Sequence, residues 1–157
     1  MEKKYREREI LSKIVRKLRK SGFKVGLING VFDLLHSGHI QIMMESKKFC
    51  DILIVALNSD SSTKKIKGKS RPILNQDERI KIISAIEYVD YVTIFDERTA
   101  SKTLKIIKPT FHIKGGEYKN IQLPEKNLTQ RHGIKTILIG DKKLNSTTDI
   151  IQKIKEL

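Results

Sequence analysis

The sequence is short of the residues on which secreted and membrane proteins rely. Among its 157 residues there is one cysteine, Cys50, so the chain can form no internal disulfide and no cysteine cluster that binds zinc. No apolar run approaches the roughly 20 residues that cross a bilayer, and the charged N-terminus lacks the apolar region of a signal peptide. We therefore expect a cytoplasmic protein with no membrane partner, folded around a hydrophobic core alone.

Aromatic residues are also scarce, which bears on the meaning of the charge. There is no tryptophan, aromatic residues make up 6% of the chain, and no helix-turn-helix, zinc-finger or aromatic RNA-binding signature is present. Acidic residues are few as well, 18 against 32 lysines and arginines, for a net charge of +14. Three partners fit this charge: nucleic acid, an anionic surface or a polyphosphate metabolite. Without a binding signature, nucleic acid is the less favoured partner and stays as the non-enzyme alternative.

The first 22 residues predict a basic amphipathic helix that packs on the rest of the chain. Residues 1–24 hold ten basic and three acidic residues, and five apolar residues recur there at helical spacing. These are Ile10, Leu11, Ile14, Val15 and Leu18. One face of the helix would contact the domain, and the opposite, basic face would be solvated. We divide the chain into this helix, residues 1–22, and a domain formed by residues 23–157.

Residues 23–157 alternate between short apolar runs and longer amphipathic stretches. The run 51–57 contains consecutive apolar residues, which is typical of a central parallel strand covered on both faces. Strands are predicted over residues 24–29, 51–57, 91–95, 111–114 and 136–139. Helices are predicted over residues 40–49, 99–107 and 127–132, after a cap at Asn75, and after a cap at Ser146 with Ile150, Ile151 and Ile154 facing inward. The lysine-rich stretch 59–74 is predicted to be a loop.

This alternation predicts the α/β fold class. We expect a single Rossmann-like domain with a doubly wound, parallel five-stranded sheet and helices on both faces. Ligands of such sheets bind beyond the carboxyl ends of the strands, where the strand order reverses. The loops after residues 29, 57, 113 and 139 should therefore share one rim.

The loop after the first predicted strand carries the strongest chemical signal. Residues 29–39 read Asn-Gly-Val-Phe-Asp-Leu-Leu-His-Ser-Gly-His, which places His36 and His39 at the start of a helix. Free backbone N–H groups and the helix dipole favour phosphate there, and the imidazoles add donors. Gly38 lets a ligand approach the backbone closely. A zinc site would need a third ligand and the spacing of H-E-x-x-H, so we predict phosphate binding and no metal bound by protein side chains.

Residues 30–39 of this loop resemble the HxGH signature of a nucleotidyltransferase superfamily that includes glycerol-3-phosphate cytidylyltransferase and nicotinamide-mononucleotide adenylyltransferase. Further matches follow in the family's order: residues 58–63 (Asn-Ser-Asp-Ser-Ser-Thr), 67–72, 78–79, 89–90, 114–118 (Lys-Gly-Gly-Glu-Tyr) and 146–148 (Ser-Thr-Thr). Together the matches cover most of the chain, and they most resemble the adenylyltransferase part of ADP-heptose synthase.

This resemblance implies an enzyme of the nucleotidyltransferase class. A phosphate oxygen of the acceptor would attack the α-phosphorus of ATP in line, and pyrophosphate would leave. The protein must then hold two polyanions together, and it need not supply a nucleophile. The implied acceptor is a sugar phosphate such as heptose 1-phosphate. Mg²⁺ bound to the triphosphate is the implied cofactor, and a homodimer is the implied assembly.

The resemblance also implies a role for each matched residue. The catalytic residues would be His36, His39 and Lys67. The nucleotide would be bound by Asn29, Gly30, Phe32, Gly38, Lys114, Gly115, Gly116, Glu117, Ser146, Thr147 and Thr148. The acceptor would be bound by Asp33, Asp60, Lys65 and Arg79. Structural alternatives stay open for some of them: the lysines could be solvated, Asp60 could cap a turn and Ser146 could simply cap a helix.

Two departures from the family leave the substrates open. Cytidylyltransferases carry an arginine-containing run before Ser-Thr-Thr, whereas residues 141–145 here read Asp-Lys-Lys-Leu-Asn, which weighs against CTP. Residues 121–132 do not follow the heptose enzymes closely, so the acceptor can differ from heptose 1-phosphate. CTP with glycerol 3-phosphate, or with another small phosphorylated alcohol, is the alternative substrate pair.

Overall fold

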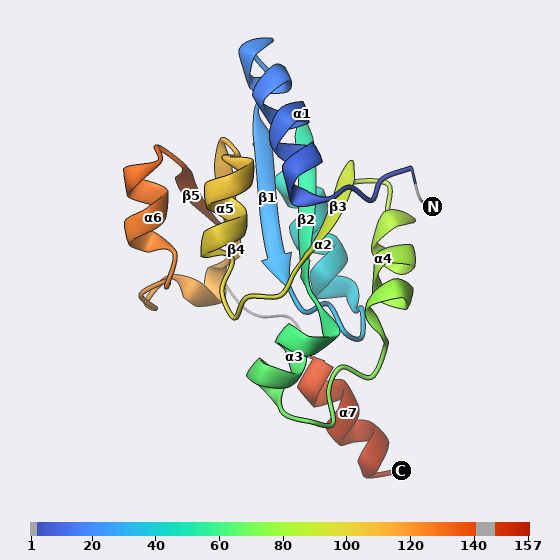
Figure 1. Cartoon of the computed structure of the whole chain (residues 1–157). Coiled ribbons are helices and arrows are strands. Elements are labelled where there is room, and N and C mark those ends of the chain that lie inside the picture. The colour runs from blue at the N-terminus through green and yellow to red at the C-terminus, as the bar shows by residue number, and fades with distance from the viewer. Residues whose placement is uncertain (1–2, 141–146) are drawn as a thin grey trace.

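The structure, a computed structural model, describes residues 3–140 and 147–157 and is built around one parallel five-stranded sheet. The strands are β1 (Val25–Gly30), β2 (Ile52–Asn58), β3 (Tyr91–Phe95), β4 (Phe111–Gly115) and β5 (Lys135–Ile139). Their order in the sheet is β3-β2-β1-β4-β5 (Figure 1). The predicted α/β class with five parallel strands is confirmed, and every strand lies within one residue of its predicted bounds.

Helices cover both faces of the sheet, as expected for a doubly wound fold (Figure 1). They are α1 (Arg8–Lys20), α2 (Ser37–Ser46), α3 (Asp60–Lys67), α4 (Gln76–Ser84), α5 (Ser101–Ile107), α6 (Lys126–Arg131) and α7 (Thr147–Lys155), with the short 3₁₀ helix η1 (Gly116–Tyr118). Among the described helices, none is long and apolar enough to cross a membrane.

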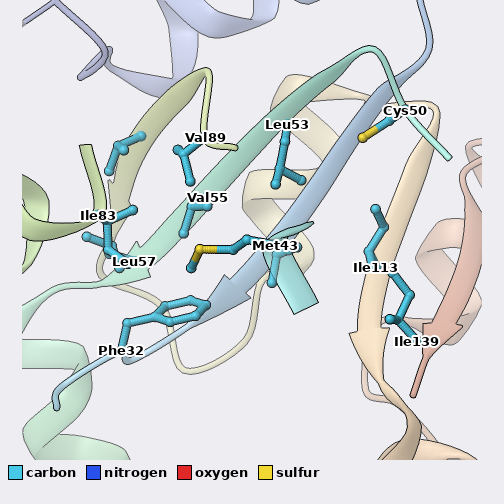
Figure 2. Packing of buried hydrophobic residues seen from close by; sticks show 12 residues of the cluster. Phe32, Met43, Cys50, Leu53, Val55, Leu57, Ile83, Val89, Ile113 and Ile139 are labelled. Carbon is cyan, nitrogen blue, oxygen red and sulfur yellow. The ribbon is translucent and has the colours of Figure 1, made fainter. Parts of the chain in front are cut away.

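The central strand β2 shows why its sequence is a continuous apolar run. Side chains of a strand alternate between the two faces of a sheet, and both faces are buried here. Leu53, Val55 and Leu57 belong to the core cluster beneath α2 and α4, seen in Figure 2. Ile54 and Ala56 belong to the second cluster, beneath α1 and α5.

The strand order reverses at β1. The chain runs outward from β1 to β2 and β3, crosses back to β4 on the other side of β1, and ends the sheet at β5. The connections that leave β1 and β4 therefore diverge to opposite sides of the sheet at its carboxyl edge. This divergence opens a crevice between neighbouring strands, which is where ligands of doubly wound sheets bind.

The leading segment forms α1, as predicted, and it also contributes backbone pairing. Leu11 and Val15 of α1 are buried in the core, where the helix packs against β1 and α5. Before the helix, Tyr5 forms a parallel bridge with Val92 of β3. The N–H of Arg6 donates to the Val92 carbonyl at 2.9 Å, and Val92 N–H donates to the Lys4 carbonyl at 2.9 Å. Residues 4–6 thus cover the outer edge of β3.

The prediction of a loop over residues 59–74 is wrong for its first half, which forms α3. Ser59 caps this helix, with its hydroxyl accepting a hydrogen bond from the Ser62 N–H. Asp60 lies in the first turn and Lys64, Lys65 and Lys67 lie in the last, an order of charges that the helix dipole favours. Helix formation here rests on capping and charge placement, which a search for apolar periodicity does not detect.

The closing helix α7 is present, but its predicted packing is wrong. Ile150, Ile151 and Ile154 were expected to face inward, yet α7 has no buried residue and Ile154 is 60% exposed. The helix extends beyond the carboxyl-terminal edge of the sheet, not over one of its faces (Figure 1). The predicted cap, Ser146, lies outside the described residues.

Asp33 ties the loop after β1 to the segment before α4. Its carboxylate is only 2% exposed and accepts hydrogen bonds from Arg71 Nε at 2.6 Å, the Ile73 N–H at 2.8 Å and the Leu74 N–H at 2.9 Å. Burial alone would raise the pKa of this carboxyl, but these N–H groups and the guanidinium outweigh it and hold the pKa below its usual range. In this structure the carboxylate of Asp33, predicted to bind the acceptor, holds the protein's own backbone.

Arg79 is also a structural residue, contrary to the predicted contact with substrate. Its side chain is fully buried, and its guanidinium reaches three loops. Nη1 donates to the carbonyls of Val31 and Asn58 at 2.7 Å each, and Nε donates to the Leu74 carbonyl at 3.0 Å. Nη2 pairs with Asp60 at 2.7 Å. The Arg79 guanidinium is thus engaged within the protein and does not line the pocket, and Asp60 serves as its partner.

The Asp33 contacts predict a pH-dependent loss of stability. Replacement Asp33→Asn should lower the free energy of unfolding at pH 7 by about 2–3 kcal/mol, because it removes the charge from several buried hydrogen bonds. The pKa of Asp33 in the folded protein lies below the unfolded value of about 3.9. The difference in unfolding free energy between the wild type and Asp33→Asn is therefore complete above that value, and it shrinks as the pH falls below about 4. Urea unfolding between pH 3 and pH 7 measures this. The exposed Glu87→Gln serves as control, and equal stability of Asp33→Asn and wild type at pH 7 would contradict the prediction.

The Arg79 contacts predict a larger loss. Replacement Arg79→Met fills the space but leaves one buried and two part-buried carbonyls without their donor, so unfolding should cost about 3–5 kcal/mol less than in the wild type. The midpoint of denaturant unfolding measures it. Lys81→Met, at an exposed position of the same helix, should change stability by about 0.5 kcal/mol or less. Similar midpoints for the two variants would refute the structural role of Arg79.

Candidate functional site

A pocket of about 670 Å³ lies at the carboxyl edge of the sheet, where the strand order reverses. The pocket is lined by residues at or after the carboxyl ends of β1, β2, β4 and β5. The loops after these strands were predicted to share one rim. The predicted site residues that line the pocket are Asn29, Gly30, Phe32, Asp33, His36, Gly38, His39, Lys67, Lys114, Gly115, Glu117, Thr147 and Thr148. The predicted residues outside its lining are Asp60, Lys65, Arg79 and Gly116.

The two histidines lie together at the start of α2. Their rings stack with centroids 3.8 Å apart. The backbone N–H of His36 donates to Nδ1 of His39 at 3.4 Å, so the neutral His39 ring carries its proton on Nε2. The ring of Phe32 lies 5.1 Å from that of His39 and fixes its position further. The helix start thus combines backbone N–H groups with ring donors, as an anion site requires.

A tight turn after β1 brings this pair to the pocket. Phe32 has a φ of 48°, an unusual value for a residue with a side chain, and its buried ring belongs to the core beneath α2 and α4 (Figure 2). A Cβ on Gly30 would stand 2.9 Å from that ring, which is closer than real contacts allow. Glycine at this position therefore lets the ring fold back against the strand end.

His112 on β4 orients Asn29 at the end of β1, a contact that the sequence analysis missed. The His112 side chain is fully buried, and its Nε2 lies 2.9 Å from Asn29 Oδ1. Burial, with a smaller effect from nearby Lys114, lowers the pKa of His112 to about 3, so the ring is neutral. Because Oδ1 can only accept, Nε2–H must donate, and the Asn29 amide group keeps its N–H donors for the pocket.

The carboxyl end of β4 supplies a buried cation. Lys114 is only 9% exposed, and its Nζ lies 4.5 Å from the centre of the Tyr118 ring. Desolvation lowers the pKa of Lys114, against the opposing effects of Glu125 and Glu117. A Cβ on Gly115 would overlap the Glu117 carboxylate, so the glycine is required for Glu117 to fold over the strand end. Gly116, predicted to bind nucleotide, begins η1 and does not line the pocket.

Two further helices, α3 and α7, lie at the same rim. Lys67 in the last turn of α3 lines the pocket, whereas Lys65 does not. Thr147 and Thr148 begin α7, and the Thr147 hydroxyl donates to the Leu34 carbonyl at 3.0 Å. This hydrogen bond connects the start of α7 to the histidine loop. Two helix starts and a lysine therefore border one cavity.

The pocket also contains residues that the sequence analysis did not propose. Arg71 reaches the lining because Asp33 holds its Nε. Arg98 and Thr99 follow β3, whose loop was left out of the predicted rim, and Glu125 comes from the segment before α6. Arg98 and Thr99 could have been predicted to line the pocket, because they follow a predicted strand. No sequence signal identifies Glu125, because its partner groups come from distant segments.

Comparison with known proteins agrees with this geometry. The model of the cytidylyltransferase-like family matches residues 27–157. The bifunctional protein HldE of Aliarcobacter butzleri is 42% identical over 148 residues, which cover 94% of this chain and 30% of that protein. HldE of Trichlorobacter lovleyi is 38% identical over 153 residues, 98% of this chain and 31% of that protein. The chain therefore spans about a third of the length of these curated relatives.

Two solved structures share the fold. The lipopolysaccharide core biosynthesis protein from Thermoplasma volcanium is 30% identical with a TM-score of 0.65, over 78% of this chain and 100% of that one. Pantoate-beta-alanine ligase from Francisella tularensis, complexed with beta-gamma ATP and beta-alanine, has a TM-score of 0.66 at 19% identity, over 98% of this chain and 78% of that one. The second likeness concerns the fold alone. Since the family match spans both the sheet and the pocket, this chain belongs to the cytidylyltransferase-like family and is a nucleotidyltransferase.

Proposed function

We propose that the chain transfers AMP from ATP to a sugar 1-phosphate, such as heptose 1-phosphate, and releases pyrophosphate. The strongest support is that a stacked histidine pair, Lys67 and the threonines of α7 all line one pocket. The likeness to the HldE proteins over nearly the whole chain supports the heptose acceptor. We further propose that the enzyme acts in the cytoplasm as a homodimer.

The reaction needs no nucleophile from the protein. A phosphate oxygen of the acceptor forms a bond to the α-phosphorus of ATP, and the bond from that phosphorus to the α–β bridging oxygen breaks. Its electron pair leaves with pyrophosphate. Both reactants are anions, so the barrier is set by bringing them together and by the charge that develops on the phosphoryl oxygens. Cationic and N–H donors around the pocket reduce both costs.

The proposed roles follow from where each side chain lies. His36 and His39, at the start of α2, would donate to the triphosphate and stabilise the transition state. Lys67 would neutralise charge on the leaving group or acceptor. Thr147 and Thr148 would bind the β- and γ-phosphates at the start of α7. Arg71 would bind the acceptor, the role that was predicted for Asp33 and Arg79.

Mg²⁺ would arrive on the triphosphate and neutralise its charge. Among residues 3–140 and 147–157, no group of three or more histidine, cysteine, aspartate or glutamate side chains could hold a metal ion. The protein's own task is then to bind and orient the phosphates around that ion.

The substrate pair can be tested directly. Purified protein is incubated with ATP or CTP, with Mg²⁺, and with heptose 1-phosphate or glycerol 3-phosphate, while pyrophosphate is measured. We expect release with ATP and heptose 1-phosphate only, and none after Mg²⁺ is chelated. Release with CTP and glycerol 3-phosphate alone would replace our substrate assignment with the cytidylyl one, and no release with any pair would refute the proposed reaction.

The histidine pair gives a second test. His36→Ala should lower kcat by about 10²–10³-fold, the usual effect of removing one donor that stabilises transition-state charge. The variant should keep the wild-type circular dichroism spectrum and unfolding midpoint. His132→Ala, at the end of α6 and outside the pocket lining, should keep wild-type kcat. Equal kcat values for His36→Ala and wild type would remove the histidine from the mechanism.

A further inference from the structure

Glu125 buries a carboxylate oxygen that has no donor within the described chain. The residue lies between η1 and α6 and is 2% exposed. Its Oε1 accepts a hydrogen bond from the Ala100 N–H, before α5, at 3.1 Å. Its Oε2 is buried, and among the described residues it has no hydrogen-bond partner. Leaving a buried acceptor unsatisfied costs about 1–3 kcal/mol, and more for a charged group, so this oxygen needs a donor from elsewhere.

Lys114 presents the complementary group in the same pocket. It is also buried, and in the described part of the chain its Nζ has the Tyr118 ring as its neighbour but no hydrogen bond or ion pair. Both residues line the same pocket, and Glu125 acts electrostatically on Lys114. The pocket therefore offers a buried acceptor and a donor in one cavity.

The surroundings of this pair suit a flat ring. Tyr118, Leu123 and Pro124 line the pocket beside Glu125. The same cavity continues to His36 and His39 at the start of α2. A nucleotide whose phosphates lie at the histidines could therefore place its base at Lys114 and Glu125.

We infer that Glu125 determines base specificity by accepting a hydrogen bond from the exocyclic amine of the nucleobase, while Lys114 donates to the adjacent ring nitrogen. This inference rests on the proposed function. Adenine and cytosine both carry an amine donor beside a ring-nitrogen acceptor, whereas guanine, hypoxanthine and uracil carry a carbonyl beside a ring N–H. The arrangement therefore accepts ATP and CTP and opposes GTP, ITP and UTP, because an incoming carbonyl oxygen would face the carboxylate.

The first test uses the unmodified protein and measures nucleotide binding by calorimetry with Mg²⁺ and no acceptor. ATP should bind at least tenfold more tightly than ITP, which reverses the donor and the acceptor. Purine riboside triphosphate lacks only the amine, and it should also bind about tenfold more weakly than ATP. Equal affinity for ATP and purine riboside triphosphate would overturn the inference, whatever the behaviour of any variant.

The second test reverses the proposed contact. In Glu125→Gln the amide oxygen can keep the bond to the Ala100 N–H, and the amide NH₂ then takes the place of Oε2 as a donor. The ratio of ATP affinity to ITP affinity should fall at least tenfold. Glu45→Gln, a carboxylate change on α2 in the lining of the same pocket, should leave this ratio unchanged.

Two outcomes of the variant would contradict the inference. An unchanged ratio in folded Glu125→Gln would show that the carboxylate does not contact the base. A higher KM for the acceptor with an unchanged ratio would place Glu125 against hydroxyl groups of the acceptor instead. Because binding is measured without acceptor, the base preference can fail while pyrophosphate release persists, and the proposed reaction can fail while the base preference holds.

Discussion

The site depends on side chains that hold three separate loops at fixed positions at the carboxyl edge of the sheet. Loops that leave neighbouring parallel strands have no backbone ladder in common, so side chains must join them. Arg79 does so with one guanidinium bonded to carbonyls after β1, at the end of β2 and before α4. Asp33 adds a second connection between the first and the third of these segments. The histidine turn and the segment that carries Arg71 are thereby held at fixed positions around the same cavity.

The buried charged residues fall into two groups, those that hold the loops together and those that face the pocket. The buried charges of Asp33 and Arg79 are satisfied by the protein and maintain its shape. Lys114 and Glu125 are buried too, yet they retain bonding capacity toward the pocket. The proposed polyanionic substrate would bind at this pocket, which Lys67, Arg71 and Lys114 line. Further basic residues lie on α1, which is at the top of Figure 1, whereas α3 and α7 are at the bottom.

The sequence predicts the central strand β2 well because it is buried on both faces, and a continuous apolar run is a local signal. The rim follows from the strand order, and most of the predicted site residues, which the resemblance supplied, line it. The roles of Asp33 and Arg79 could not be predicted, because their partners are set by long-range packing and a charged residue near a motif resembles a ligand. His112 and Glu125 were missed for the same reason: Asn29 lies 83 residues from His112 in the chain. Helix α3 was missed because Ile66 is its one large apolar residue.

The pairing of residues 4–6 with β3 covers an outer strand of the sheet. An outer strand offers unpaired backbone groups to other molecules, and proteins that leave such strands open risk unwanted association. Here the start of the chain occupies one margin of the sheet. Among the described strands β5 pairs with β4 alone. The exposed Lys135 lies on β5, where a charged side chain discourages the addition of a further strand.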